Sequence, residues 1–280
     1  MNVFYTTLSL QNELKKLAEN KTIGLVPTMG ALHKGHVSLI ETAKAENDIT
    51  VVSIFVNPTQ FDKQEDLTNY PRTLESDLEL LKNVKCDVVY VPSPEDIYNN
   101  NVISEKFDFD GLEKEMEGKH RKGHFDGVGT IVKKLFEAVK PTNAYFGEKD
   151  FQQLQIIKKL VEKYHIPVKV IGCEIYREKD GLAMSSRNLR LTEQQRKEAP
   201  FIYKTLKKAK QLFTEKPITE VKKWVEKEFA KNQTLILEYF DIADINTLKS
   251  AKRKGRKAKY RGFIAVYADN IRLIDNIPLN

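Results

Sequence analysis

The sequence predicts an α/β fold, with a doubly wound parallel sheet in the N-terminal part and a smaller α+β domain after it. Up to about residue 172, short runs that are apolar throughout alternate with amphipathic helical patterns, as is typical of parallel strands covered by helices on both faces. After residue 176, helical patterns come first and strand-like runs follow, which favours an α+β domain. We therefore expect domains at residues 1–176 and 177–280.

The elements of the N-terminal part follow from these patterns. A helix is expected at Val37–Asn47, and apolar residues recur at helical spacing from Val128 to Val139 and from Phe151 to Tyr164. In a doubly wound sheet, ligands bind at the carboxyl ends of the strands, near the point where the strand order reverses. The expected strands are Thr22–Pro27, Ile49–Val56, Cys86–Val91, Asn143–Phe146 and Val168–Ile171.

The C-terminal part begins with a capping box, in which Thr192 and Gln195 start a helix that runs to about Phe213. A second helix is expected from Pro217 to Phe229. The strand-like runs that follow are Leu235–Ile242, Gly262–Ala268 and Ile271–Ile274.

Composition places the chain among ordinary globular proteins, since 41% of its residues are hydrophobic and 30% are charged. No apolar run approaches the ~18 residues of a membrane span. Met1–Tyr5 lacks the features of a secretory signal, so we expect a cytoplasmic protein. Cys86 and Cys173 lie in or beside apolar runs, which favours small buried hydrophobic side chains over metal ligands.

The net charge of +7 comes from one segment, Lys249–Arg261, which contains eight basic residues and no acidic one. Without those eight, the 46 basic residues of the chain fall to 38, against 39 acidic residues. We therefore expect a solvated basic loop and no specific nucleic-acid partner.

The most informative motif is H-x-G-H, formed by His33 and His36 where the first clear strand turns into a helix. At such a turn the free backbone N–H groups and the positive end of the helix dipole face outward. Gly30 and Gly35 let the backbone approach a ligand, and the imidazoles add donors that can become cationic. The motif predicts a site for a polyphosphate whose charge grows during reaction.

A second motif, Arg177–Asn188, places the adjacent hydroxyls of Ser185 and Ser186 before the cation Arg187. These groups can surround phosphate oxygens, although such a string can also form a polar surface loop. Together with the H-x-G-H turn, it favours an enzyme that attacks the α-phosphate of ATP and releases pyrophosphate.

Other polar residues follow the ends of predicted strands. Asn57 and Gln60 carry amides, which suit the hydroxyl and carboxylate groups of a small substrate or stabilise a loop. Lys149 can offset phosphate charge or be an exposed lysine. Asp150 suits a ribose or a metal-bound water, or is only an N-cap. Gln153 lies one turn into the next helix and could face the same rim.

Five further polar residues carry weaker signals. Arg121 is interpreted as an anion contact, whereas loop packing is favoured for the flanking His120 and His124. His165 lies near a helix end and is interpreted as structural. Asp77 is a weak metal candidate, because no second carboxylate is fixed by spacing.

Seven blocks in order along essentially the whole chain resemble the pantoate–β-alanine ligase family. The main departure is the basic stretch Lys249–Arg261, which touches none of these motifs. The blocks are VPTMGALHKGH (Val26–His36), SIFVNPTQF (Ser53–Phe61), YPR (Tyr70–Arg72), HRKGHFDGV (His120–Val128), AYFGEKDFQQ (Ala144–Gln153), REKDGLAMSSRN (Arg177–Asn188) and RLIDN (Arg272–Asn276).

The resemblance implies a two-step ligation, in which ATP adenylates the carboxylate of (R)-pantoate and the amine of β-alanine then displaces AMP to give pantothenate. It also implies a Rossmann-like N-terminal domain of the H-x-G-H nucleotidyltransferase type and a smaller C-terminal domain that closes over the site. Mg²⁺ is expected with the ATP, and a homodimer is expected.

The same resemblance assigns residues. It implies that Gln60 and Gln153 hold pantoate, that His36 is the proton donor and that the Tyr176 backbone lies by the adenine. The groups expected to balance charge are His33, His36, Lys149, Ser185, Ser186 and Arg187. The full expected ATP site comprises Met29, Gly30, Ala31, Leu32, His33, Lys34, Gly35, His36, Gly147, Glu148, Lys149, Asp150, Tyr176, Met184, Ser185, Ser186 and Arg187.

Two other classes of protein share parts of this pattern. A class I aminoacyl-tRNA synthetase shares the H-x-G-H logic, but the Asn57–Gln60 block is not part of its pattern and no anticodon-binding extension is visible. A nucleic-acid-binding module built on Lys249–Arg261 would need interleaved aromatic residues, and the segment holds only Tyr260.

Overall fold

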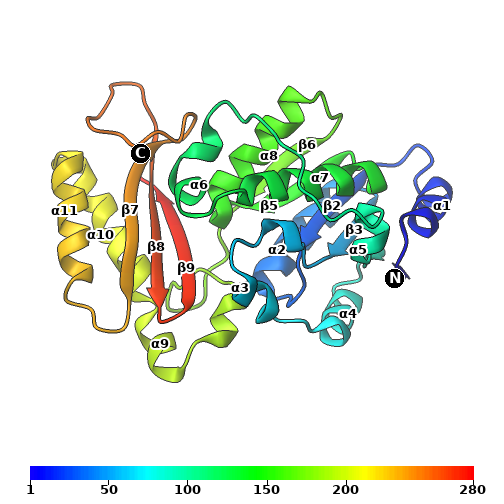
Figure 1. Cartoon of the computed structure of the whole chain (residues 1–280), viewed down its shortest axis with the longest axis horizontal. Coiled ribbons are helices and arrows are strands. Elements are labelled where there is room, and N and C mark those ends of the chain that lie inside the picture. The colour runs from blue at the N-terminus through cyan, green and yellow to red at the C-terminus, as the bar shows by residue number, and fades with distance from the viewer. The chain divides into compact units, whose positions relative to one another are not determined.

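A six-stranded parallel sheet organises the first of two units in the computed structural model, which describes residues 1–280 (Figure 1). The strand order is β1-β4-β3-β2-β5-β6, and every neighbouring pair is parallel. The chain runs outward from β2 through β3 to β4 and then returns to place β5 on the other side of β2. The strand order thus reverses between β2 and β5, where this fold class binds ligands. The strands are β1 (Asn2–Phe4), β2 (Ile23–Thr28), β3 (Ile49–Ile54), β4 (Val88–Tyr90), β5 (Asn143–Gly147) and β6 (Lys169–Cys173).

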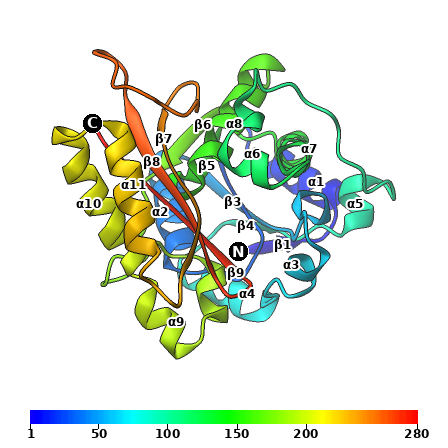
Figure 2. The same cartoon turned by 60° about the vertical axis from the view of Figure 1, so that its left-hand side comes forward.

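Helices cover both faces of this sheet, as the continuous apolar strands predict (Figure 2). Residues of α2 and α4 pack with Val26, Val52 and Val89 on one face. On the other face α7 contacts β2 and α1. The helices of this part are α1 (Thr7–Leu17), α2 (Lys34–Glu46), α3 (Gln64–Thr68), α4 (Leu74–Asn83), α5 (Pro94–Tyr98), α6 (Met116–His120), α7 (His124–Val139) and α8 (Phe151–Lys163), with short 3₁₀ turns η1 (Pro58–Gln60), η2 (Leu112–Lys114) and η3 (Glu148–Asp150).

The second unit is built on a three-stranded antiparallel sheet of order β7-β8-β9. Helices α10 and α11 pack against each other and against this sheet, and their apolar residues, Leu206 and Val221 among them, form one core with Ile264 of β8. The elements are η4 (Ser186–Arg190), α9 (Glu193–Glu198), α10 (Phe201–Glu215), α11 (Ile218–Phe229), β7 (Ile236–Asp244), β8 (Tyr260–Ala268) and β9 (Ile271–Pro278).

The two units do not divide the chain at a single point. The first comprises Met1–Glu148 and Gln153–Glu174, and the second comprises Lys149–Gln152 and Ile175–Asn280. Four residues that carry an expected catalytic lysine therefore belong to the C-terminal unit, although the first unit continues after them. The division into domains at residues 1–176 and 177–280 stays a prediction.

Three details differ from the expectations. The capping box at Thr192 forms, but the helix that it begins ends at Glu198, and a second helix starts after Pro200. Proline lacks the N–H that a continuous helix would need at that point, which explains the break. The apolar pattern does not predict the short edge strand β1. Arg261 is buried in β8 and does not belong to the exposed basic loop.

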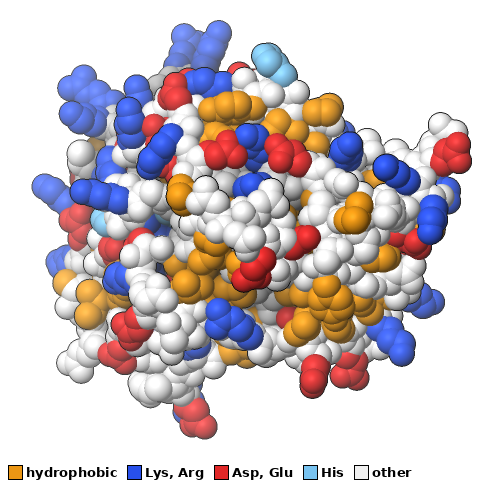
Figure 3. Space-filling model, turned by 45° about the vertical axis from the view of Figure 1, so that its right-hand side comes forward, with side chains coloured by type: hydrophobic (Ala, Val, Ile, Leu, Met, Phe, Trp, Pro, Cys, Tyr) orange, Lys and Arg blue, Asp and Glu red, His pale blue; other side chains and the backbone are white.

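The remaining basic residues, 249–259, lie in the connection between β7 and β8, and all of the lysines and arginines in it are exposed. Elsewhere the charge is balanced: acidic and basic side chains are interspersed over most of the face drawn in Figure 3.

No helix combines the length and apolar character of a membrane span. Cys86 and Cys173 are free and buried, and burial raises the pKa of the Cys86 thiol to about 12.

Candidate active site

The turn after β2 is held open by a buried carboxylate. Asp77 of α4 accepts hydrogen bonds from the backbone N–H of Ala31 at 2.9 Å and of Leu32 at 2.7 Å. Gly30 has a φ of +80°, and a Cβ there would lie 3.1 Å from the carboxylate, so only glycine fits without strain. Thr73 donates to Asp77 as well, which leaves both oxygens of the weak metal candidate occupied by the protein. Asp77 is a positioning residue for the loop.

Two imidazoles form a reciprocal cap at the start of α2. The Nδ1 of His33 accepts from the Gly35 N–H at 3.1 Å, and the Nδ1 of His36 accepts from the His33 N–H at 3.3 Å. The rings stack with their centroids 4.0 Å apart. Because both Nδ1 atoms are acceptors, each neutral ring carries its proton on Nε2, the nitrogen that can donate to an anion. The caps therefore fix the tautomer at the positive end of a 13-residue helix.

Asn57, at the end of β3, is buried and uses its amide within the protein. Its Nδ2 donates to the carbonyl of Gly127 and to Gln60 Oε1, both at 3.2 Å. Its Oδ1 accepts from the hydroxyls of Tyr98 at 2.5 Å and Thr59 at 3.2 Å. Asn57 thus orients Gln60, and the substrate contact that we expected for Asn57 itself stays a prediction.

Gln60 joins two of the expected motifs. Its Nε2 lies 3.0 Å from the Met29 sulfur, so the η1 turn and the loop after β2 meet at this side chain. Gly127 of α7 packs so closely on η1 that a Cβ would lie 2.2 Å from the Thr59 carbonyl oxygen. The helix backbone therefore fixes where the amide of Gln60 stands.

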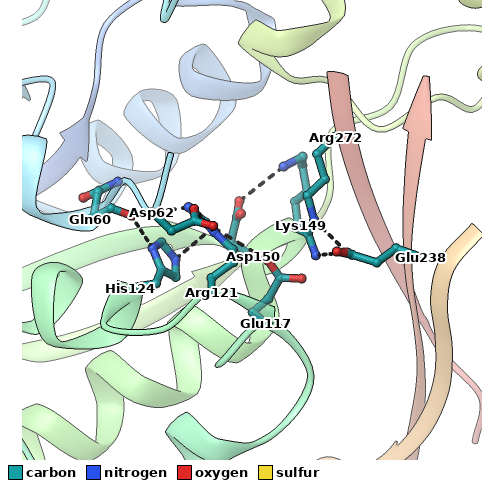
Figure 4. A network of polar contacts seen from close by, with 9 residues as sticks. All are labelled: Gln60, Asp62, Glu117, Arg121, His124, Lys149, Asp150, Glu238 and Arg272. Carbon is teal, nitrogen blue, oxygen red and sulfur yellow. Dashed lines mark hydrogen bonds and ion pairs between the residues drawn. The ribbon is translucent and has the colours of Figure 1, made fainter. Parts of the chain in front are cut away.

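His124, which is itself paired with Arg121, holds the backbone of Gln60 (Figure 4). The Nδ1 of His124 donates to the Gln60 carbonyl at 2.7 Å, and its Nε2 accepts from Arg121 at 3.1 Å. Burial, aided by the Arg121 cation, lowers the pKa of His124 to about 3, so the ring is neutral. Loop packing is confirmed for this histidine, whereas His120 and His165 are exposed.

The anion contact expected of Arg121 is made by protein carboxylates. Its Nε lies 3.2 Å from Asp62 and its Nη1 lies 3.7 Å from Glu117. With 16% of its side chain exposed, the guanidinium is enclosed between them and His124. A contact between Arg121 and substrate stays a prediction.

The expected ATP-site residues Gly147–Asp150, at the end of β5, are divided between the two units. Gly147 pairs with Cys173 of β6, and it remains with Glu148 and the half-buried Gln153 in the first unit. Lys149 and Asp150 belong to the second. Figure 4 shows the Lys149 ammonium beside the Asp150 carboxylate, with 3.5 Å between Nζ and Oδ2.

The second motif folds as a small hairpin that delivers its serines to a 3₁₀ turn. Arg177 and Ala183 form an antiparallel bridge, and the Met184 N–H donates to the Tyr176 carbonyl at 3.0 Å. Ser185 then caps η4 by accepting from the Arg187 N–H at 3.3 Å. Ser186 is buried, and η4 contacts β9. Serines and arginine are therefore presented on one short, braced segment.

Two residues of β9 contact these segments, and the sequence patterns do not single them out. Asp275 binds Arg177 and Asn276 binds the Lys149 carbonyl. The only sequence signal for them was the closing block Arg272–Asn276, whose partners lie about a hundred residues away. No group of three or more His, Cys, Asp or Glu side chains is placed to hold a metal ion.

A parallel sheet with H-x-G-H at its central β–α turn, and a braced serine–arginine segment elsewhere in the chain, defines a nucleotide-binding α/β enzyme that transfers nucleotidyl groups. The chain belongs to the pantoate–β-alanine ligase family, whose model matches residues 2–278. The chain is 58% identical to the pantothenate synthetase of Flavobacterium psychrophilum and 54% identical to that of Christiangramia forsetii, with each alignment covering all of both chains.

Solved structures agree on the fold. The pantothenate synthetase of Thermus thermophilus is similar with a TM-score of 0.91 and 36% identity, over 100% of this chain and 99% of that one. The pantoate–β-alanine ligase of Francisella tularensis, complexed with beta-gamma ATP and β-alanine, is similar with a TM-score of 0.81 and 36% identity, over 100% and 98%. The expected class of fold and the expected family are both confirmed.

Proposed function

We propose that this chain joins (R)-pantoate and β-alanine to form pantothenate, with conversion of ATP to AMP and pyrophosphate. Family membership supports the overall reaction. The observation that carries the chemistry is the double imidazole cap, which holds two Nε2–H donors at the N-terminus of α2. That arrangement suits a phosphate whose negative charge increases as a bond breaks.

In the first step, a carboxylate oxygen of pantoate attacks the α-phosphorus of ATP. The bond from that phosphorus to the β-phosphate oxygen breaks, and pyrophosphate leaves with the electron pair. Both reactants are anions, so catalysis consists largely of neutralising repulsion and aligning them. Positioning of this kind supplies effective molarities of ~10⁵ M or more. His33, His36, Lys149, Ser185, Ser186 and Arg187 are the groups that we assign to charge balance.

Pantoate is assigned to the amides of Gln60 and Gln153. The position of Gln60 is set from three sides, by Met29, by Asn57 and by His124. Such constraint favours a substrate-orienting role, because an amide that is already fixed loses little freedom when the ligand binds.

In the second step, the amine of β-alanine attacks the acyl carbon of the pantoyl-adenylate. The bond to the AMP oxygen breaks, the amine loses a proton and AMP departs. His36, whose Nε2 carries a proton in the neutral ring, is assigned as the proton donor to the departing group.

Magnesium is proposed to enter with the ATP phosphates. The chain offers no cluster of three ligating side chains, and both oxygens of Asp77 are occupied by backbone N–H groups. Asp150, with 46% of its side chain exposed, is the protein oxygen donor that fits best. Mg²⁺ usually keeps several waters and binds through phosphates, so this donor set is sufficient. When bound, the ion would add charge neutralisation at the phosphates.

A homodimer in the cytoplasm is proposed as the working form.

Pyrophosphate exchange tests this function. Labelled pyrophosphate should enter ATP when pantoate is present and β-alanine is absent, because the acid is activated before an amine is needed. His36→Ala should slow this exchange about 10²–10³-fold. His165→Ala is the matched control, since that histidine is exposed at the end of α8. Exchange that requires β-alanine, or transfer-RNA charging in its place, would contradict the proposal.

A further inference from the structure

We infer that Asp275 and Asn276, which are adjacent on β9, are positioning residues that hold the Lys149 segment and the serine–arginine segment 184–187 in place. The inference rests on the proposed function, in which those two segments balance phosphate charge. Neither β9 residue is assigned to touch a substrate. Each is assigned to act through a neighbour.

Asn276 anchors the Lys149 segment. Its Nδ2 donates to the Lys149 carbonyl at 2.9 Å, and its Oδ1 accepts from Arg261. Only 1% of the residue is exposed. The Arg261 guanidinium in turn lies over the Phe151 ring, 4.1 Å from its centroid. The segment is therefore held at residue 149 by a hydrogen bond and at residue 151 by ring packing.

Asp275 anchors the second segment through Arg177. The two carboxylate oxygens accept from the guanidinium at 2.7 and 2.9 Å in a bidentate pair, and the carboxylate is almost fully buried. The same guanidinium donates to the Gly181 carbonyl at 3.1 Å and lies 3.6 Å from the centroid of the Tyr203 ring. Arg177 thus ties both arms of the hairpin to β9.

The hairpin passes this constraint on to the serines. Its outgoing arm continues directly from the bridge at Ala183 into Ser185, which caps η4. Asn188 of η4 donates back to the Ala183 carbonyl at 3.2 Å. A displacement of Arg177 would therefore move the hydroxyls and Arg187 together.

Adjacent residues on a strand point to opposite faces of the sheet, and this geometry lets one dipeptide serve two segments. Asn276 lies opposite Phe263, on the side where Phe263 packs against Phe151. Asp275 lies opposite Ile264, on the side of the core that includes α10. The two residues are also linked, since the Asn276 N–H donates to the Asp275 carboxylate at 2.7 Å.

The main test uses Asn276→Asp, which keeps the size and the acceptor for Arg261 but removes the donor to Lys149. Pantoate-dependent pyrophosphate exchange should fall about 10²-fold in kcat, the loss expected when a catalytic group is displaced by about 1 Å. In a Lys149→Ala background the same substitution should cost less than about threefold, because residues that act as one unit are not additive.

The companion variant Asp275→Asn should show the same non-additivity with Arg187→Ala. Asp241→Asn is the matched control: it removes an acidic side chain of β7 that pairs with Lys222 at 3.0 Å, on the same sheet. The control should lower the melting temperature without changing kcat. Each variant is assayed at the same number of degrees below its own melting temperature. If Asn276→Asp does not fold, Asn276→Ala takes its place.

The outcomes separate the two levels of inference. If the wild-type protein shows no pantoate-dependent exchange, the proposed function fails. If the wild-type protein is active and the β9 variants keep near-normal kcat, the positioning role is wrong. Full additivity of Asn276→Asp with Lys149→Ala would also overturn it, because a merely structural residue gives that result.

Discussion

A histidine that caps a helix with one nitrogen has the other nitrogen in a fixed direction. In His33 and His36 the Nδ1 atom accepts a backbone hydrogen bond and so caps the helix. The Nε2 atom of the same ring is the proposed donor to phosphate. The sequence predicts that the histidines lie at a helix start. The pattern does not reveal which nitrogen faces the backbone, because that depends on rotamers chosen by the fold.

The two roles of His33 can be separated by substitution. Asparagine is a strong N-cap, so His33→Asn should leave the free energy of unfolding nearly unchanged. His33→Ala removes the cap and should lower the free energy of unfolding by about 1 kcal/mol. Both variants should lose about 10²–10³-fold in pyrophosphate exchange. Thermal unfolding and exchange kinetics measured on the same preparations give the result. Retained exchange in His33→Asn would mean that the ring serves only as a cap.

His124 should make stability depend on pH. The pKa of His124 in the folded chain is about 3, below its ordinary value of 6.5. Between these two values the unfolded chain binds a proton at this residue and the folded chain does not. Stability from this group is therefore complete above pH 6.5 and is lost as the pH falls from 6.5 toward 3. His124→Asn, which keeps a donor for the Gln60 carbonyl, should reduce the slope between pH 6 and 4.5 by about one proton. Denaturant unfolding across that range measures the slope, with His165→Asn as the substitution control.

At the scale of elements, the position of the η1 turn, which we propose to bind pantoate, depends on the close approach of two backbones. The η1 turn packs directly on α7, and glycine at residue 127 makes the contact possible. The helical periodicity of 128–139 predicts α7, and those apolar positions are buried or half-buried as expected. It does not predict which loop the glycine face meets, because that pairing joins segments 70 residues apart.

Gly127→Ala should displace η1 and raise the pantoate KM at least tenfold, with a smaller effect on the ATP KM. The new Cβ would meet the Thr59 carbonyl oxygen at 2.2 Å, and a backbone atom cannot rotate away. Gly129→Ala is the matched control in the same helix, because its nearest neighbour is the Phe107 side chain at 2.9 Å. Steady-state kinetics measure the pantoate KM of both variants. Equal pantoate KM values for Gly127→Ala and Gly129→Ala would contradict the prediction.

Across the whole molecule, patterns identified nearly every strand, since strands buried on both faces read as unbroken apolar runs. All six residues of β3 are buried. What the sequence could not supply was the partnership of distant polar residues. The pattern does not reveal that Asp77 accepts from the Ala31 and Leu32 N–H groups, or that Arg121 pairs with Asp62 and Glu117. The metal role of Asp77 and the substrate contact of Arg121 stay predictions. A charged residue finds its partner only after the chain has folded.

The basic loop is expected to be dispensable for ligation. None of the lysines and arginines in 249–259 forms an ion pair, and Lys254, which lies over the Phe213 ring, anchors the loop to α10. Replacing its other lysines with glutamine should leave turnover within about twofold of the wild type. RNA retained by the wild-type loop should dissociate steeply with salt, because that binding is counterion release. Filter binding at low and physiological salt checks this, and salt-resistant, sequence-selective retention would reveal a second function.

The hydrogen bond between Lys149 and Asn276 spans 127 residues of chain. A ribosome adds about 5–20 residues each second, so the lysine emerges roughly 6–25 s before its anchor. Early in that interval β6 emerges and completes the set of six parallel strands, while Phe151 still lacks Arg261 and Phe263. The segment that we propose to balance phosphate charge therefore gains its anchors on β8 and β9 only near the end of translation.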